Sequence, residues 1–200
     1  MSQRRTPSRR ESLASALAVG LSGLVAIANS SHAQQAGARS RLLVAYFSRS
    51  GNTRLIAGHV RRILNADLFE IQPAQPYPED YEATVRQAER ERDADFLPPL
   101  KETAVGIASY ETIFLGFPIW GMTAPPVIGS FLSQHDLSGK AIVPLVTHGG
   151  YGTGRSLAAI RRLASKASVR EGFTLQMDQE REILQRVTRW LGTVDVRKQL

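Results

Sequence analysis

The chain has 200 residues, and its apolar fraction of 42% and charged fraction of 22% are ordinary for a protein that buries one core. This composition excludes a disordered chain, a collagen and a membrane protein with several spans. The absence of cysteine excludes a disulfide framework, a thiolate metal site, an iron–sulfur cluster and a cysteine nucleophile. Residues 1–33 supply +3 of the formal charge of +7, and the remaining +4 does not by itself indicate a nucleic-acid partner.

The first 33 residues have the three-part pattern of a secretory signal peptide. A basic start up to Arg10 is followed by an uncharged apolar run from Leu13 to Ile27, and small residues stand at the signal-peptidase positions in 31–33. The apolar run of 15 residues is shorter than the ~20 residues that a membrane-spanning helix needs. This length favours cleavage over a permanent anchor, so we expect no stable membrane insertion after the signal is removed.

The basic segment also resembles the S-R-R-x-F-L-K motif of twin-arginine signals. Residues 8–13 read SRRESL, with Ser12 in place of the preferred Phe and Ala14 in place of the Lys. That export route carries proteins already folded, often around a cofactor. We therefore expect a signal peptide over 1–33, a linker over 34–40, a functional domain over 41–200 and a periplasmic location. The alternative is a disordered basic tail that binds acidic surfaces.

After residue 40, apolar strands alternate with helices. Leu42–Phe47 is a continuous apolar run, which is typical of a strand buried on both faces of a parallel sheet. Apolar residues then recur at helical spacing from Leu55 to Leu64, and Ala66–Gln72 is predicted as the second strand. A loop over 73–78 leads into a charged helix over Glu79–Asp95.

The alternation continues to the C-terminus. Further strands are predicted over Thr112–Phe117, Ala141–Val146 and Phe173–Gln176. Further helices are predicted over Pro125–Leu132, Ser156–Ala167 and Glu180–Leu191, the first with proline in its opening turn, where proline is tolerated. This order predicts an α/β fold, a three-layer doubly wound sandwich around a five-stranded, mainly parallel sheet.

Unusual loops follow three of these strands, over residues 48–53, 117–124 and 147–154. In an open parallel sheet all three lie at the carboxyl edge, where ligands bind. The first loop offers four hydroxyl or amide side chains and Gly51 at a helix N-terminus, whose unsatisfied N–H groups and partial charge of about +0.5 suit a phosphate. An ordinary N-cap cluster is the simpler alternative, but four such side chains exceed what a cap needs. The loop lacks the P-loop lysine and the dinucleotide G-x-G-x-x-G pattern.

The other two loops offer rings and flexible backbone. Trp120 lies between Pro118 and Gly121, and it is either an aromatic wall for a planar ligand or a ring packed under its own loop. The third loop has four glycines in eight residues, so its backbone can approach a ligand, and Tyr151 supplies a second ring. His148 is either a capped loop histidine or a polar ligand contact.

Together these segments resemble the flavodoxin family. Residues 44–53 (VAYFSRSGNT) resemble its T/S-x-T/S-G-x-T phosphate loop, and residues 116–120 (GFPIW) resemble the loop that covers one face of the flavin. Residues 147–154 (THGGYGTG) resemble the partner loop on the pyrimidine side. The resemblance spans about residues 41–192, and it implies a sheet of order 2-1-3-4-5 with FMN bound non-covalently.

The resemblance also implies a cofactor site made of all three loops, with no metal and no catalytic residue, since the flavin carries the redox chemistry. Residues 48–53 hold the phosphate in this interpretation, 118–121 line the isoalloxazine ring and 149–151 form its other rim. The cofactor-binding residues that it implies are Ser48, Arg49, Ser50, Gly51, Asn52, Thr53, Pro118, Ile119, Trp120, Gly121, His148, Gly149, Gly150 and Tyr151.

The implied function is electron transfer through the flavin, to a redox partner protein or to a small-molecule acceptor. Classical electron-carrier flavodoxins are strongly acidic, which serves docking to basic partners, whereas this chain carries about +4 after residue 33. An NAD(P)H-dependent quinone or nitro reductase is therefore an open alternative, as is a flavin-free binding protein on the same fold. The sequence leaves open whether the chain is an enzyme and what its oligomeric state is.

Two other classes are disfavoured. A phospho-receiver domain needs clustered acids after the first strand, where Tyr46, Phe47 and Ser48 stand. A serine hydrolase needs a G-x-S-x-G pentapeptide, and none occurs after residue 33.

Overall fold

The computed structural model describes residues 41–176 and 182–194. The predicted signal peptide and linker lie outside these residues, and none of the described helices has the length and apolarity that a bilayer span requires. The strands are β1 (Leu42–Tyr46), β2 (Asp67–Glu70), β3 (Thr112–Pro118), β4 (Ala141–His148), β5 (Ser168–Val169) and β6 (Phe173–Gln176). The helices are α1 (Asn52–Leu64), α2 (Tyr81–Asp93), α3 (Pro126–Gln134), α4 (Ser156–Leu163) and α5 (Ile183–Thr193), with a 3-10 turn at Ile107–Ser109.

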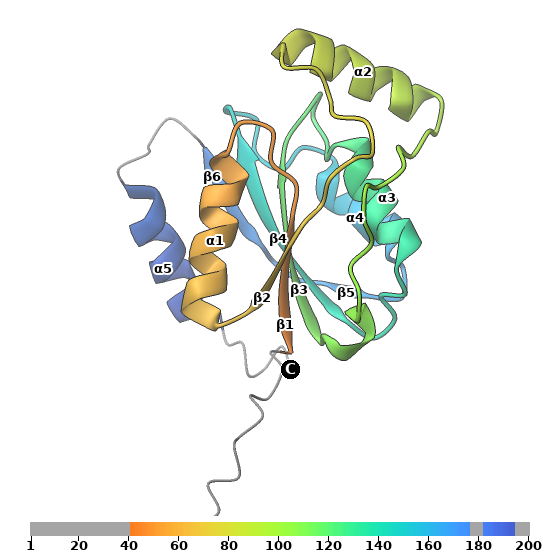
Figure 1. The fold of residues 1–200 in the computed structure, drawn as a ribbon. Coiled ribbons are helices and arrows are strands. Elements are labelled where there is room, and N and C mark those ends of the chain that lie inside the picture. The colour runs from red at the N-terminus through yellow and green to blue at the C-terminus, as the bar shows by residue number, and fades with distance from the viewer. Residues whose placement is uncertain (1–40, 177–181, 195–200) are drawn as a thin grey trace, which may run out of the picture. The chain divides into compact units, whose positions relative to one another are not determined.

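The strands form one parallel sheet of order β2-β1-β3-β4-β5, which confirms the predicted α/β fold and strand order. Strands β1, β3 and β4 are buried along almost their whole length because helices cover both faces of the sheet. Helices α1 and α5 cover one face, and α3 and α4 cover the other (Figure 1). Each face has its own apolar core, around Ile56 and Val187 on one side and around Ile128 and Ile160 on the other.

The fifth position of the sheet contains two short strands, where the sequence predicts only β6. Both pair with β4, β5 through Ile142↔Val169 and β6 through Leu145↔Phe173. Between these two pairs the edge strand has three residues, 170–172, whereas β4 has only two, 143 and 144. The N–H groups of Ser168 and Arg170 bond to the carbonyls of Lys140 and Ile142, so alternation along β4 turns the nitrogen of Pro144 toward this strand. Proline has no N–H to offer, and the ladder breaks there in a bulge.

Several elements are shorter than predicted, but their places are as expected. Strand β2 ends at Glu70, and α4 ends at Leu163 because the chain turns over 164–167 to enter β5. Helix α2 begins after Asp80, whose side chain caps it by accepting the N–H of Ala83 at 2.7 Å. Figure 1 shows α2 beyond the carboxyl edge of the sheet rather than stacked on a face. This placement brings the start of α2 to the edge where the three loops lie.

Candidate functional site

The first loop delivers the N-terminus of α1 to the carboxyl edge of the sheet. Gly51 precedes the helix with a φ of 94°, no side chain caps the first turn, and no acidic residue lies in it. Among the described residues, the side chains of Ser50 and Asn52 form no hydrogen bond, while Ser48 Oγ accepts the N–H of Gly51 at 3.1 Å. A helix end with free N–H groups and free hydroxyl and amide side chains is suited to an anion.

A buried hydrogen bond joins the first loop to the third. Thr53 Oγ1 lies 2.9 Å from Thr147 Oγ1, and both side chains are almost completely buried. Thr53 is in the first turn of α1, and Thr147 is near the end of β4. The pair therefore fixes the helix N-terminus against the strand after which the third loop begins.

The second loop contains a tight two-residue turn. Trp120 and Thr123 exchange backbone hydrogen bonds of 2.9 and 3.3 Å, and the two residues between them, Gly121 and Met122, both have positive φ. Positive φ at both central positions is the signature of a type I′ turn, which a methionine rarely enters. We refer to residues 120–123 as the 120–123 turn.

The third loop holds that turn in place. The N–H of Arg155 bonds to the carbonyl oxygen of Met122 at 2.8 Å, and a Cβ on Gly154 would lie 2.1 Å from the same oxygen. Only glycine allows this approach. Within the loop, His148 Nδ1 accepts the N–H groups of Gly150 and Gly152 at 3.0 and 3.2 Å, so this histidine organises the loop backbone.

The ring of Trp120 is almost completely buried beneath its own loop. It is 2% exposed, and its ring meets the rings of Phe47 and Tyr77 edge-on, with centroids 5.3 and 4.9 Å away. Tyr77 donates a hydrogen bond of 2.8 Å to Glu91. Burial, and then this bond to Glu91, raise the pKa of the Tyr77 phenol far above its usual value, so it stays protonated as a donor. The structure thus shows Trp120 packed beneath its own loop and also in the lining of a cavity at the loops, so the two interpretations open for it do not exclude each other.

Two cavities open at the loops and share Tyr81 and Ile119 in their walls. One, of about 210 Å³, is lined by Ser50, Asn52 and Thr53 of the first loop and by parts of both other loops. The other, of about 520 Å³, lies between the start of α2 and the 120–123 turn, with Tyr151 at its side. The two cavities thus adjoin at Tyr81 and Ile119, one lined by hydroxyl and amide side chains beside the α1 N-terminus and the other mainly apolar.

The exposed rings at this site are Tyr81 and Tyr151, at 51% and 73% exposure. The sequence predicts Tyr151, but it gives no sign of Tyr81, whose position depends on where α2 lies. The guanidinium of Arg49 lies 5.4 Å from the Tyr81 ring centroid and donates to the carbonyl oxygen of Glu79 at 2.9 Å. Arg49 thus connects the phosphate-type loop to the start of α2.

Comparison with known proteins decides the family. The model of the flavodoxin family matches residues 41–194. The chain belongs to the flavodoxin family. Among curated protein sequences, none matches it at a significant level.

Solved structures share the fold of this flavodoxin-family chain over most of their length. A protein of Bacteroides eggerthii assigned as a flavoprotein is 30% identical with a TM-score of 0.66, and the match covers 76% of this chain and 96% of that one. A Bacteroides uniformis protein with the same assignment is 27% identical with a TM-score of 0.66, covering 75% and 99%. A flavoprotein of Lactobacillus acidophilus, solved in complex with FMN, is 19% identical with a TM-score of 0.61, covering 75% and 97%.

In this member of the flavodoxin family, most of the predicted site residues lie around the two cavities. The smaller cavity is lined by nine of them: Arg49, Ser50, Asn52, Thr53, Pro118, Ile119, Trp120, His148 and Gly149. The larger cavity is lined by Gly121 and Tyr151, together with Ile119. Ser48, Gly51 and Gly150 shape the loops through their backbone or their bonds to it. The residues that the sequence interpretation missed are Tyr81, Met122 and Thr147, which come from α2, from the 120–123 turn and from β4.

Proposed function

We propose that this chain binds FMN non-covalently at the three loops and transfers electrons through it, as a flavodoxin-like redox protein. The observation that carries the proposal is the uncapped, acid-free N-terminus of α1, with Ser50 and Asn52 beside it and an apolar, ring-lined cavity adjoining. Membership of the flavodoxin family supports FMN as the cofactor, and the L. acidophilus flavoprotein with the same fold was solved in complex with FMN.

The residues at the two ends of the site fit the two ends of FMN. The free N–H groups at the start of α1 and the side chains of Ser50 and Asn52 would hold the phosphate, since all are donors that an anion requires. Arg49 adds a positive charge at the same end. Tyr81, Ile119 and Met122 would contact the isoalloxazine ring, because they line the apolar cavity that continues from the phosphate end.

When bound, the flavin supplies the redox chemistry, and the chain's own groups set its surroundings. Ile119 and Met122 exclude water from one side of the cavity. Tyr151, largely exposed, extends beside the opening and shields it. No residue of the site is required to act as an acid or a base.

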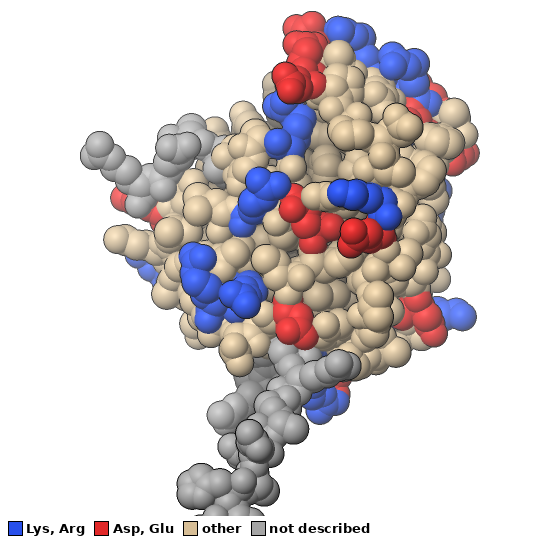
Figure 2. Space-filling view, in the orientation of Figure 1, with Lys and Arg blue, Asp and Glu red and all other residues tan. Residues whose placement is uncertain are grey.

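We favour an electron carrier over an NAD(P)H-dependent quinone or nitro reductase, and we propose the periplasm as its location on the strength of the signal pattern over 1–33. Nicotinamide dinucleotides are not expected in the periplasm, so a protein donor fits that location better. On the face in Figure 2, basic and acidic side chains are interspersed rather than gathered into one acidic area. A partner with mixed surface charge therefore suits this face better than a strongly basic one.

The test is a titration of the purified apoprotein with FMN, followed by flavin absorption and by quenching of flavin fluorescence. We expect saturable binding that Ser50→Ala weakens by about tenfold or more, the value of a lost hydrogen bond to a charged group. Tyr81→Ala should weaken binding and also change the flavin absorption bands. Ser165→Ala, at an exposed position far along the chain in the turn after α4, is the matched control and should bind like the wild type.

The outcomes separate the three functions. Absence of binding at micromolar FMN would contradict the proposal and leave a flavin-free binding protein. Rapid reduction of the bound flavin by NADH or NADPH alone, with turnover on a quinone, would favour the reductase. Reduction only by a protein or chemical donor would favour the carrier.

A further inference from the structure

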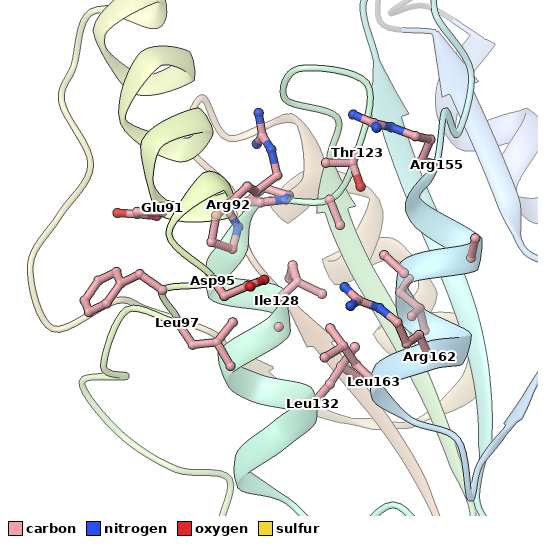
Figure 3. Close-up of a pocket in the computed structure, with 18 of the residues that line it drawn as sticks. Glu91, Arg92, Asp95, Leu97, Thr123, Ile128, Leu132, Arg155, Arg162 and Leu163 are labelled. Atoms are coloured by element: carbon pink, nitrogen blue, oxygen red, sulfur yellow. The ribbon is translucent and has the colours of Figure 1, made fainter.

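A third cavity, of about 580 Å³, lies away from the α1 N-terminus, between the end of α2 and the helices α3 and α4. Small-molecule sites commonly have volumes of about 300–1,000 Å³. Figure 3 shows that its walls come from these three helices and from the segment after β3. Thr123 and Ala124 line this cavity, whereas Gly121 and Met122 line the larger cavity of the candidate cofactor site. The 120–123 turn therefore separates this cavity from that site.

The floor of this cavity is apolar. Ile128 and Leu132 of α3 are buried beneath it, and Leu97 and Leu163 stand at its sides (Figure 3). Leu97, Leu163 and neighbouring Phe96, which is 50% exposed, are among the few large apolar side chains that the described surface exposes. Such a gathering of exposed apolar groups marks a binding site more often than a free surface.

Glycine keeps the cavity open at its base. A Cβ on Gly129 would lie 2.8 Å from Leu97 Cδ2 and 3.5 Å from Leu163 Cδ1. The missing side chain lets Leu97 and Leu163 approach α3 while the space above it stays empty. The hollow is thus built into the sequence of α3.

Arginines from two helices surround the apolar floor. Arg162 lies in α4 and Arg155 directly precedes that helix, and neither side chain forms an ion pair or hydrogen bond within residues 41–176 and 182–194. Arg92 of α2 also lines the cavity, and its guanidinium lies beside the 120–123 turn, with Nη1 3.5 Å from the carbonyl oxygen of Trp120 and Nη2 close to Gly121. Three guanidinium groups in a shared cavity favour an anionic ligand.

The acidic residues of the cavity oppose this charge only in part. Glu91 is occupied by Tyr77 and Gln87, each donating at 2.8 Å, and Figure 3 shows it pointing away from the cavity. Asp93 lies on the exposed side of the α2 terminus. Asp95 points inward on the side of the cavity opposite Arg162 (Figure 3), and it forms no ion pair within residues 41–176 and 182–194.

We propose that this cavity binds an organic anion, a molecule with an apolar body and one carboxylate or sulfonate group. The apolar body lies on Leu97, Ile128 and Leu163, and the anionic group is held by Arg162 and Arg155. The proposal does not rest on FMN binding, because the apoprotein already contains every group that it uses.

The test uses the full-length apoprotein and 8-anilinonaphthalene-1-sulfonate, a fluorescent probe with an aromatic body and a sulfonate. We expect saturable fluorescence enhancement that decanoate reverses and decanol does not. Arg162→Gln should lower the affinity for the probe about two- to fivefold, the range for an exposed ion pair. Arg161→Gln removes the same charge from the preceding position of α4, which does not line the cavity, and should leave probe binding unchanged. Ala158→Phe, which places a ring into the cavity from an exposed position of α4, should weaken it at least tenfold.

Other results would overturn the proposal. Equal effects of Arg161→Gln and Arg162→Gln would show attraction by overall charge only, and complete displacement of the probe by FMN would place it at the three loops. Wild-type affinity in Ala158→Phe, with an unchanged circular dichroism spectrum, would place it elsewhere on the surface. Absence of saturable binding would leave the apolar surface as a docking face for a protein partner and refute a small-anion site.

Discussion

The buried pair Thr53–Thr147 is the direct link between the helix that presents the phosphate-type loop and the strand that precedes the third loop. Replacing either threonine by valine keeps the shape of the side chain and removes its hydroxyl. Each single change therefore breaks the 2.9 Å hydrogen bond and leaves the other hydroxyl buried without that partner. Replacing both removes the unpaired group as well.

The magnitudes follow from this asymmetry. Thr53→Val and Thr147→Val should each lower the free energy of unfolding by about 1–3 kcal/mol, since a buried hydroxyl that loses its partner carries its desolvation cost. The double variant should lose much less than the sum of the two, since an apolar pair of the same shape is nearly neutral. The coupling energy of the cycle should be about 1–2 kcal/mol.

Urea denaturation of the four proteins, with the slope of each transition checked for equality, measures this cycle. The two residues are 94 positions apart in the sequence, so coupling reports tertiary contact and not local structure. If the two single losses add to within about 0.5 kcal/mol, the hydroxyls are independent and the link between the loops is refuted.

Two further predictions concern the loops and α1. Gly154→Ala would place a Cβ 2.1 Å from the carbonyl oxygen of Met122 at a φ of +51°. It should therefore lower the free energy of unfolding by at least about 1–3 kcal/mol and weaken FMN binding by displacing the 120–123 turn. Gly149→Ala, whose Cβ meets nothing within 4 Å, should lower stability much less in the same urea assay. The pKa of His59 lies below its usual value because burial, and then Arg62, disfavour the charged ring, so stability should fall as the pH drops through the unfolded-state value of about 6.5. His59→Gln should reduce that fall between pH 7.5 and 5.5, and an unchanged pH profile would exclude His59 as its source.

The long strands could be predicted because each is apolar along its whole length, whereas their order came from the resemblance to the flavodoxin family. Leu42–Tyr46, Thr112–Pro118 and Ala141–His148 are buried on both faces, and this pattern is visible in the sequence without any knowledge of their neighbours. The split of the last position was not predicted. It depends on Pro144 turning its nitrogen toward the edge, which only the register of β4 against its neighbours reveals.

The loops of the candidate site could be located for a similar reason. Residues 48–53 and 147–154 consist of small, polar and glycine residues directly after strands, and the carboxyl edge of a parallel sheet gathers such loops whatever their details. Tyr81 could not be located in this way. It stands in a polar segment whose only signal is that of a helix start, and it reaches the site because α2 lies beyond the edge of the sheet.

Trp120 shows why the role of a single ring cannot be obtained from its own loop. A tryptophan between Pro118 and Gly121 is equally compatible with an exposed wall and a buried anchor, and the choice depends on partners far away in the chain. Those partners are Phe47, at the end of β1, and Tyr77, in the loop before α2. Because Tyr77 is itself held by the buried Glu91 of α2, packing of the ring fixes the 120–123 turn, the β2–α2 loop and α2 together. Trp120 still lines part of the smaller cavity, and Tyr81 and Tyr151 supply the rings that remain exposed at the site.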